Sequence, residues 1–581
     1  MFRPRSIAIV GASEKPTYGG RLFINLLTSG FKGRIYPVND KYENLRGLKC
    51  YSTVAEIPDE LDLVVYAAPR RFIMDVLEQC STSGAKSIAI ITAGLGEADE
   101  EGKELQRGIK EFCKKTGIRI CGPNCYGLAN FLQNVMAIPE REAFRNCIRG
   151  RISSILQSGA LAFGSLFHYA CDREIGFSYV ISTGNEVDLE VTDYMRYLLR
   201  EPNTNVIAIV VEALKNPMSF LEVADFALGL KKPIVALKLG RSALGSKAAL
   251  SHTGSMTGSD SVYDAVFRQK RIIRVHNLDE LIDTAYVLSN LKSPIGDGVA
   301  IVSTSGGLGT FLTDSFEEVG ISVPELPGES LRKILAIEGL LVFDRLQNPI
   351  DIRGQGFSVL HEVLPPLMED EKYGAIVLAM AHALPNSVGD ITRVSESAEK
   401  PMFVIWSGRK SPLKGEKWKD QGYKILERNM VFVFYDPLKC VRVIRNYINY
   451  FVFRRHRPPK TKTRERGEIH LEETKERLSL QEGVLKYRDS ISLLLEYGIP
   501  VAKGDIVTTR EEAVEVANRM GYPVAIKVVS SHIPHKIDLG VLELNIGSSS
   551  QLVESFDKVL KNALRMIPKT QIEGILVKRC L

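Results

Sequence analysis

The segment ALSHTGSMTGSD (249–260) has the residue types of a loop that carries a phosphoryl group. His252 stands there among serines, threonines and glycines. Such a stretch offers many hydroxyls and backbone amides but little apolar surface for a core. A neutral imidazole can attack phosphorus, and the phosphorylated ring can pass the group on. His252 is therefore our candidate phosphate carrier, and a structural histidine is the alternative.

Glu212 ends the apolar run VIAIVVEA (206–213), which predicts a buried parallel strand. Functional side chains of α/β domains gather at the carboxyl ends of such strands. A histidine nucleophile needs a group, typically a carboxylate, that fixes its tautomer and orientation. Glu212 is our candidate for that role, and a solvated glutamate at a strand end is the alternative.

Two predicted strands are followed by small-residue turns suited to anions. Gly11 in SIAIVGASEKPTYGG (6–20) allows a tight turn, after which the free amides of the next helix face a bound anion. The spacing is not GxGxxG, so no dinucleotide is specified. The turn QSGA (157–160), with Ser158 and Gly159, has the same character. An ordinary strand–helix turn and a Ser/Gly helix cap are the alternatives.

Apolar strand-like runs alternate with helical periodicity from the N-terminus to about residue 450. Near-continuous runs of Val, Ile and Ala are typical of strands buried on both faces, and their alternation with helices predicts parallel α/β sheets. A polar, highly charged stretch with a Pro-Pro pair then reads as a linker. We predict three Rossmann- or flavodoxin-like domains, a linker and a fourth unit, at 1–128, 129–292, 293–453, 454–477 and 478–581.

The composition predicts a soluble globular protein of several domains. The chain has 581 residues, of which 45% are hydrophobic and 25% charged. Its net charge of +6 is small for this length, so nucleic acid is not expected as a partner. No secretory signal and no run of about 18 uncharged apolar residues is visible, which predicts a cytoplasmic protein without membrane spans. The nine cysteines are expected to be reduced thiols rather than zinc ligands.

Motifs that span nearly the whole chain occur in one consistent order. They are IVGASEKPTYGG (9–20), IYPVND (35–40), ITAGLGE (91–97), CGPNCYG (121–127), LQSGALA (156–162), GNEVDLEVTDYMRYL (184–198), SHTGSMTGSD (251–260), STSGGLGTFLTD (303–314) and NPIDIRG (348–354). Together they resemble the ADP-forming acyl-CoA synthetases, the acetate–CoA ligase family related to succinyl-CoA synthetase.

This resemblance implies a ligase that uses CoA, phosphate and ADP or ATP. Phosphate attacks an acyl-CoA to give an acyl phosphate, His252 takes the phosphoryl group and releases the carboxylic acid, and ADP then receives it. Glu212 matches the glutamate that supports the histidine, and Ser158 and Gly159 match the phosphate-cradling helix start. The residues that match the CoA site are Gly11, Ala12, Ser13, Lys15 and Asn39.

The fourth unit resembles the front of an ATP-grasp domain. In AIKVVSSHIPHKIDLGVLEL (525–544), Lys527 matches a nucleotide-binding lysine, and Val541 stands where the family usually has a second glycine. The other matching residues are His535, Lys536, Asp538 and Gly540. The resemblance places the Mg²⁺-binding carboxylates in sequence that would follow Leu581. We therefore expect a partial ATP-grasp domain, no metal ligands in this chain, and a homo- or hetero-oligomer that includes an ATP-grasp chain.

Two other functions remain open from the sequence. The first is a non-catalytic CoA- or acyl-CoA-binding protein, or a degenerate homologue, in which the histidine loop survives without turnover. The second is an NAD-dependent Rossmann enzyme, which would leave the histidine loop without a role. Which carboxylic acid is used is not encoded in any of these motifs, because pocket shape decides such selectivity.

Overall fold

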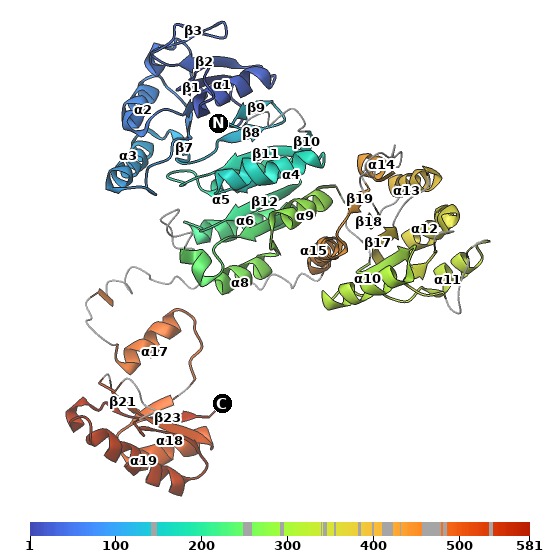
Figure 1. The fold of residues 1–581 in the computed structure, drawn as a ribbon. Helices are drawn as coiled ribbons and strands as arrows, with labels where there is room; N and C mark the ends of the chain where they lie inside the picture. Colours follow the sequence, from blue (N-terminus) through green and yellow to red (C-terminus); the bar gives the residue numbers. More distant parts are fainter. Residues whose placement is uncertain are drawn as a thin grey trace. The chain divides into compact units, whose positions relative to one another are not determined.

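Four sheets of more than two strands organise the described part of the chain. The computed structural model describes residues 1–581 except 141–147, 248–257, 291–295, 339, 341–345, 354–355, 381–384, 398–399, 409–421, 430, 456–477, 480–484, 503, 531, 534–538 and 581. The chain divides into two compact units, Met1–Arg457 and Pro458–Leu581. Figure 1 shows three of these sheets in the first unit, coloured in chain order from blue to orange.

The first sheet is fully parallel, in the order β2-β1-β5-β6-β7. Its strands are β1 (Ser6–Val10), β2 (Arg34–Val38), β5 (Leu63–Tyr66), β6 (Ser87–Ile90) and β7 (Arg119–Cys121), and a small hairpin joins β3 (Asn44–Leu45) to β4 (Leu48–Lys49). Its helices are α1 (Tyr18–Thr28), α2 (Ile73–Thr82) and α3 (Glu100–Thr116). Alternate β1 residues pack toward α1 or toward α2 and α3, so both faces are buried, as the apolar runs predict.

The second sheet has seven strands in the order β14-β13-β12-β10-β11-β8-β9. Its parallel strands are β10 (Arg149–Leu156), β11 (Phe177–Ser182), β12 (Val206–Val211), β13 (Ile234–Lys238) and β14 (Ile273–Val275), and the antiparallel pair is β8 (Leu128–Asn130) and β9 (Val135–Ala137). One face packs on the π-helix η3 (Ala160–Leu166), α4 (Phe167–Asp172) and α9 (Leu278–Asn290). The other packs on α5 (Val191–Arg200), α6 (Pro217–Gly229) and α8 (Asp260–Lys270).

The third sheet is parallel, in the order β16-β15-β17-β18-β19. Its strands are β15 (Gly298–Ser303), β16 (Ile350–Asp351), β17 (Tyr373–Met380), β18 (Met402–Trp406) and β19 (Phe432–Phe434). Its helices are α10 (Gly306–Glu318), α11 (Gly328–Leu335), α12 (Leu360–Glu369), α13 (Pro385–Ser397), α14 (Gly422–Arg428) and α15 (Pro437–Arg455). Helix α15 packs on α9, where Asn446 Nδ2 donates to Glu280 Oε1 at 3.1 Å, so the second and third sheets share one continuous core.

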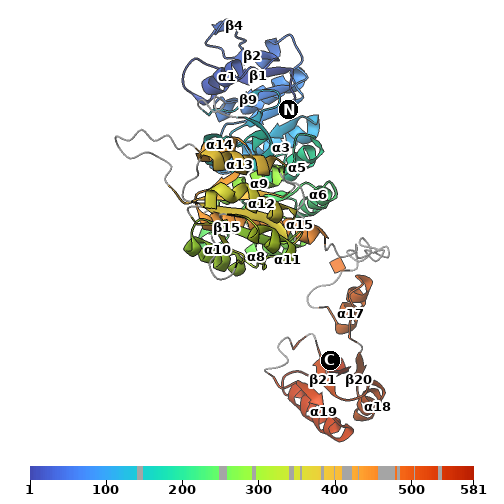
Figure 2. The same ribbon diagram turned by 90° about the vertical axis from the view of Figure 1, so that its right-hand side faces the viewer.

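The second unit carries a four-stranded antiparallel sheet in the order β20-β23-β21-β22. Its strands are β20 (Gly504–Val507), β21 (Val524–Val529), β22 (Leu542–Ile546) and β23 (Gly574–Arg579), and its helices are α17 (Tyr487–Glu496), α18 (Arg510–Met520) and α19 (Ser549–Leu564). Helices α18 and α19 lie together on one side of this sheet (Figure 2). The alternate strand residues therefore form a second face that these two helices leave uncovered.

The structure confirms the predicted parallel α/β architecture and corrects one expectation about the cysteines. Seven of the described cysteines are free thiols, but Cys171 is disulfide-bonded. The prediction of reduced thiols is therefore wrong at Cys171. Among the described residues, no helix is both long and apolar enough to span a bilayer.

Candidate functional site

The candidate site lies where the strand order of the second sheet reverses. Strands β10 and β12 are neighbours, and β11 lies on the far side of β10. Connections from two such neighbouring strands leave in opposite directions and open a crevice at their carboxyl ends. Ser158 and Gly159 follow β10, and Glu212 follows β12, so the fold brings these three predicted residues to one edge.

A cavity of about 280 Å³ opens at this edge. Its lining combines the turn after β10, the end of β12, the turn after β11 and parts of the first sheet's loops. The residues are Tyr18, Ile91, Ala93, Asn124, Cys125, Tyr126, Gln157, Ser158, Gly159, Ala160, Gly184, Asn185, Glu186, Glu212, Ala213 and Lys215. The first two sheets therefore build this cavity jointly, and Asn185 Nδ2 links them by donating to Glu97 Oε2 at 2.5 Å.

Gln157 ties the two strand ends together. Its Oε1 accepts from the backbone amides of Glu212 at 2.5 Å and Ala213 at 3.1 Å, and its Nε2 donates to the Ala213 carbonyl at 2.7 Å. The two backbone amides fix which end of the side-chain amide is oxygen. The backbone that carries Glu212, a residue only 9% exposed, is thus held against the turn that carries Ser158.

Glu186 is a buried carboxyl group that accepts a hydrogen bond from the Gln157 side chain. It is 3% exposed, and it accepts from the Thr183 hydroxyl at 2.8 Å, from the Val191 amide at 3.2 Å and from Gln157 Nε2 at 3.1 Å. Its φ of +53° lies in the left-handed region, which costs energy for any residue but glycine and is typical of functional turns. Burial raises the pKa of Glu186 to about 7, against the opposing effects of Thr183 and Lys215.

Replacing Glu186 with glutamine is expected to change how stability depends on pH. The native carboxyl keeps its proton up to about pH 7, whereas the ordinary value is 4.5. The unfolded chain therefore binds fewer protons between these values, and wild-type stability falls as the pH rises through them. This shift in pKa corresponds to a change of about 3 kcal/mol in the free energy of unfolding. The thermal midpoint of Glu186→Gln relative to wild type should rise from pH 5 to pH 7.

A matched comparison separates this effect from simple loss of a carboxylate. Glu222 lies on the same domain with its side chain 70% exposed. The midpoint of Glu222→Gln relative to wild type should stay level between pH 5 and pH 7. If the thermal midpoint of Glu186→Gln relative to wild type also stayed the same between pH 5 and pH 7, this would contradict the raised pKa of Glu186.

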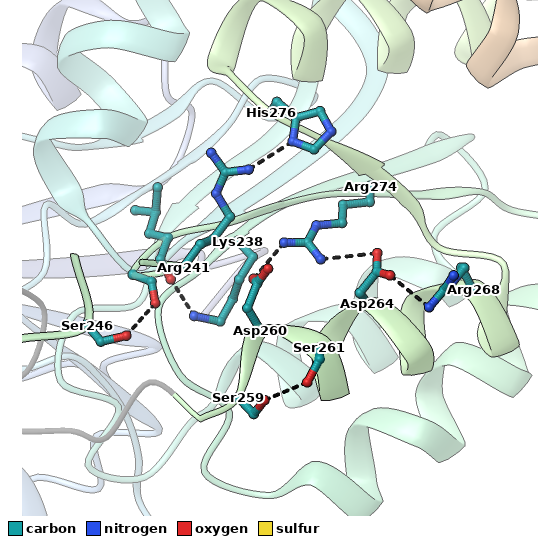
Figure 3. A network of polar contacts seen from close by, with 12 residues as sticks. Lys238, Arg241, Ser246, Ser259, Asp260, Ser261, Asp264, Arg268, Arg274 and His276 are labelled. Atoms are coloured by element: carbon teal, nitrogen blue, oxygen red, sulfur yellow. Dashed lines mark hydrogen bonds and ion pairs between the residues drawn. The ribbon is translucent and has the colours of Figure 1, made fainter. Parts of the chain in front are cut away.

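His252 lies outside the described residues, but both flanks of its segment are described. The chain leaves β13 and reaches Ser246, whose hydroxyl donates to the Gly240 carbonyl at 2.8 Å. It returns at α8, where Asp260 pairs with Arg274 of β14 at 2.6 Å (Figure 3). Since β13 is the neighbour of β12, the segment starts beside the strand that ends at Glu212.

Lys238 joins these flanks to the Glu212 backbone. It is 1% exposed at the end of β13, and its ammonium donates to the carbonyls of Glu212, at 2.8 Å, and of Leu239. The ammonium also lies 4.7 Å from the centroid of the Tyr263 ring, a favourable cation–π distance. Burial lowers the pKa of Lys238. These contacts fix the carbonyl side of Glu212, as Gln157 fixes its amide.

The predicted CoA-site residues meet at the strand reversal of the first sheet, between β1 and β5. Gly11 has φ +89°, and a Cβ there would lie 2.6 Å from the Ala67 carbonyl oxygen, so only glycine fits this turn. Asn39 at the end of β2 donates to the Ala12 carbonyl at 2.7 Å. The Ser13 hydroxyl lies 3.0 Å from that of Thr17, the N-cap of α1, and Lys15 is exposed on the same turn.

Lys527 lies on β21 in the second unit, on the sheet face that α18 and α19 leave uncovered. It borders a hollow of about 440 Å³ that also includes Lys578 and Arg579. The ammonium groups of Lys527 and Lys578 lie 5.7 and 5.6 Å from the Tyr487 ring centroid. His535, Lys536 and Asp538 lie outside the described residues. Gly540 has φ +63°, whereas the Val541 side chain is buried in the core under the sheet.

Two ionisable residues of the cavity, Glu186 and Lys215, are not among the functional residues predicted from the sequence. Glu186 stands in the motif GNEVDLEVTDYMRYL, and Lys215 follows Glu212 by three residues. A charged residue in a small-residue turn after a strand was a signal for Glu186. Nothing local marked Lys215. Among the described residues, no group of three or more metal-ligating side chains occurs.

Comparisons with known families match the described units. A CoA-binding domain matches residues 5–130, a succinyl-CoA-ligase-like flavodoxin domain matches residues 149–288, and an ATP-grasp domain matches residues 476–581. A CoA-binding sheet, a flavodoxin-like ligase sheet and an ATP-grasp domain in one chain define a nucleotide-dependent CoA ligase. The predicted α/β fold with an ATP-grasp domain is confirmed.

Two relatives narrow this class to one family. ADP-forming acetate–CoA ligase I of Archaeoglobus fulgidus is 32% identical over 100% of this chain and 82% of its own length. The α subunit of ADP-forming acetate–CoA ligase I of Pyrococcus furiosus is 35% identical over 76% of this chain and 96% of that subunit. The chain therefore belongs to the family of ADP-forming acetate–CoA ligases, and it is an acid–CoA ligase.

A solved structure agrees with this assignment. Dinucleotide-forming acetyl-coenzyme A synthetase 1 of Ca. Korarchaeum cryptofilum, in complex with phosphate and ADP, matches with a TM-score of 0.70 and 28% sequence identity. The match covers 78% of this chain and 96% of that chain. Binding of CoA and of a nucleotide by this chain follows from its domains.

Proposed function

We propose that this chain converts acyl-CoA, ADP and phosphate into a carboxylic acid, CoA and ATP through phosphohistidine at His252. The observation that carries the proposal is the cavity at the β10–β12 edge, where Gln157 holds the Glu212 backbone beside Ser158 and Gly159. In the first step a phosphate oxygen attacks the thioester carbon. The C–S bond breaks, and the phosphate proton passes to the leaving sulfur, giving acyl phosphate and CoA thiol.

The second step moves the phosphoryl group to His252. A neutral imidazole nitrogen attacks phosphorus, the bond to the acyl oxygen breaks, and the carboxylate leaves. The other ring nitrogen keeps its proton, and Glu212 holds that proton and orients the ring. Ser158 and Gly159 offer the start of the η3–α4 helical segment to the phosphate oxygens. Phosphohistidine then gives the group to ADP, which regenerates neutral His252.

The β1–α1 turn is the CoA site in this proposal. Gly11, Ala12 and Ser13 present backbone to the anionic part of CoA at the strand reversal, with Lys15 and Asn39 beside them. Helix α1 closes on this turn through Gly20, because a Cβ at Gly20 would lie 1.9 Å from the Lys15 carbonyl oxygen and 2.9 Å from that of Ser13.

Replacing Gly20 with alanine is therefore expected to open the turn and lower CoA affinity by about tenfold or more, as with other substitutions that force backbone apart. Isothermal titration with CoA measures this. Gly229→Ala is the matched control, because it lies at the end of α6 with nothing within 4 Å of the added Cβ. Equal CoA affinity of Gly20→Ala and wild type would contradict the placement of CoA at this turn.

On the nucleotide side, we assign phosphate contacts to Lys527, with Lys578 and Arg579 close by in the same hollow. Mg²⁺ would neutralise the nucleotide phosphates when bound. The described residues offer no set of three ligands for it.

We propose acetate as the first acid to test, because both curated relatives above are acetate–CoA ligases. One of them is the α subunit of a divided enzyme, which supports assembly with further ATP-grasp chains. We also propose domain boundaries at 1–128, 129–292 and 293–453, followed by a linker at 454–477 and the ATP-grasp part at 478–581.

A labelling experiment tests the proposed route. The full chain is incubated with acetyl-CoA and ³²P-phosphate in the absence of ADP, and the denatured protein is assayed for bound label. We expect label that is stable to base and lost in acid, as for a phosphorylated imidazole. Absence of label with acetyl-CoA and with longer acyl-CoA thioesters would overturn the proposal in favour of a non-catalytic CoA-binding protein.

A further inference from the structure

We infer that Lys215 is the cation that binds the phosphoryl group in the cavity, an inference that rests on the proposed function and names a ligand of the same site. The described lining of the cavity contains two carboxyl groups, Glu186 and Glu212, and one cationic side chain, Lys215. Inorganic phosphate and acyl phosphates carry about two negative charges near neutral pH, so a positive partner is required to hold them there.

The ammonium of Lys215 is held in place by neutral groups. It donates to the carbonyl of Asn185 at 2.5 Å and to the carbonyl of Glu186 at 2.8 Å, both on the turn that lines the cavity. An ammonium has three N–H donors, so one remains for a ligand. Within the described residues, the contacts of this ammonium are to carbonyl oxygens and it forms no ion pair, so its positive charge is available to an anionic ligand.

The charge of this lysine is tuned by its surroundings. Much of the side chain is exposed, but burial of the ammonium lowers its pKa, and the nearby carboxyl groups of Glu186 and Glu190 act in the opposite direction. The two carbonyls replace part of the water around this ammonium, so its attraction to an anion is stronger than in bulk water. The two carbonyls belong to Asn185 and Glu186, which line the cavity together with Ser158 and Gly159, so these contacts hold the ammonium at the cavity wall.

The same domain contains a closely matched lysine without a cavity. Lys232 Nζ donates to the carbonyls of Leu199 at 2.8 Å and Glu201 at 2.7 Å, and burial lowers its pKa as well. Lys232 does not line the cavity. A purely structural role for Lys215 would therefore be shared by Lys232, whereas binding of a phosphoryl group would belong to Lys215 alone.

Equilibrium binding of inorganic phosphate to the full chain tests the inference. Lys215→Met should weaken phosphate binding about tenfold to a hundredfold, the range for a lost charge-assisted hydrogen bond. Lys232→Met should bind phosphate with an affinity within about twofold of wild type. Lys215→Gln keeps donors for the two carbonyls without the charge, so it should fold as wild type and lose phosphate binding. All three variants should keep wild-type CoA affinity, which reports an intact first sheet.

Two outcomes would overturn the inference. The first is that Lys215→Met and Lys215→Gln bind phosphate with wild-type affinity. The second is that Lys232→Met loses as much phosphate affinity as Lys215→Met. Labelling from ³²P-acetyl phosphate distinguishes this failure from failure of the proposed function. If wild type binds phosphate through Lys215 but takes no acid-labile label, the phosphohistidine route fails and the assignment of Lys215 stands. If both lysine variants take label with wild-type dependence on acetyl phosphate, the assignment of Lys215 fails and the route stands.

Discussion

Replacing His252 with alanine is expected to lower ATP formation from acetyl-CoA, phosphate and ADP by roughly 10⁵-fold or more, as for removal of other enzyme nucleophiles. The acid-labile ³²P label should disappear, because no other group is proposed to accept the phosphoryl group. Release of CoA thiol from acetyl-CoA and phosphate, up to one equivalent per site, should persist, since His252 takes no part in breaking the C–S bond.

His276 provides the matched control for this substitution. It is a histidine of the same domain, and its ring nitrogen Nδ1 lies 2.9 Å from Arg241 (Figure 3). His276→Ala should keep both ATP formation and the label close to wild type. Persistence of the label in His252→Ala, or its loss in His276→Ala, would show that another residue carries the phosphoryl group.

Replacing Glu212 with glutamine is expected to slow phosphohistidine formation by roughly 10²- to 10⁴-fold, the range for the carboxylate that orients a catalytic histidine. An amide keeps the shape of the side chain, so the hydrogen bonds of the Glu212 backbone to Gln157 and Lys238 should survive. An amide cannot, however, stabilise the positive charge that the imidazole gains during attack. Rapid-quench labelling from acetyl phosphate measures the rate.

The pH dependence of this rate separates orientation from general damage. Loss of the carboxylate should lower the apparent pKa of His252 and shift the rising limb of the profile to lower pH. Glu222→Gln, at an exposed carboxylate of the same domain, should show the wild-type rate and profile. A rate for Glu212→Gln within about threefold of wild type would remove Glu212 from the mechanism.

The architecture was largely predictable from the sequence. Continuous runs of Val, Ile and Ala such as 206–211 are buried on both faces of a parallel sheet, and that requirement can be read from hydrophobicity alone. The strand–turn–helix starts at Gly11 and Ser158 were predictable for a similar reason, since small residues are needed wherever a chain turns tightly. Their roles rested on the resemblance to a family of ligases.

The assembly of the site could not be predicted in the same way. Strand order depends on packing between elements far apart in the chain, and hydrophobic periodicity does not specify it. Only the adjacency of β10 and β12 brings Gln157 to the backbone of Glu212, 55 residues away in sequence. Similarly, only the turn after β11, which hydrogen-bonds to Gly122 and Pro123, brings Asn185 and Glu186 to the cavity.

The sequence by itself thus determined the parallel strands of the first three sheets, the small-residue turns after β1 and β10 and the unusual histidine segment, because each depends on neighbours along the chain. The tertiary structure alone decided that Glu186 accepts a hydrogen bond from Gln157 and that Lys215 lines the same cavity. The physical reason is that a buried carboxyl group or ammonium is tolerated only where distant backbone groups satisfy it. Those partners come from the folded chain and not from the local sequence.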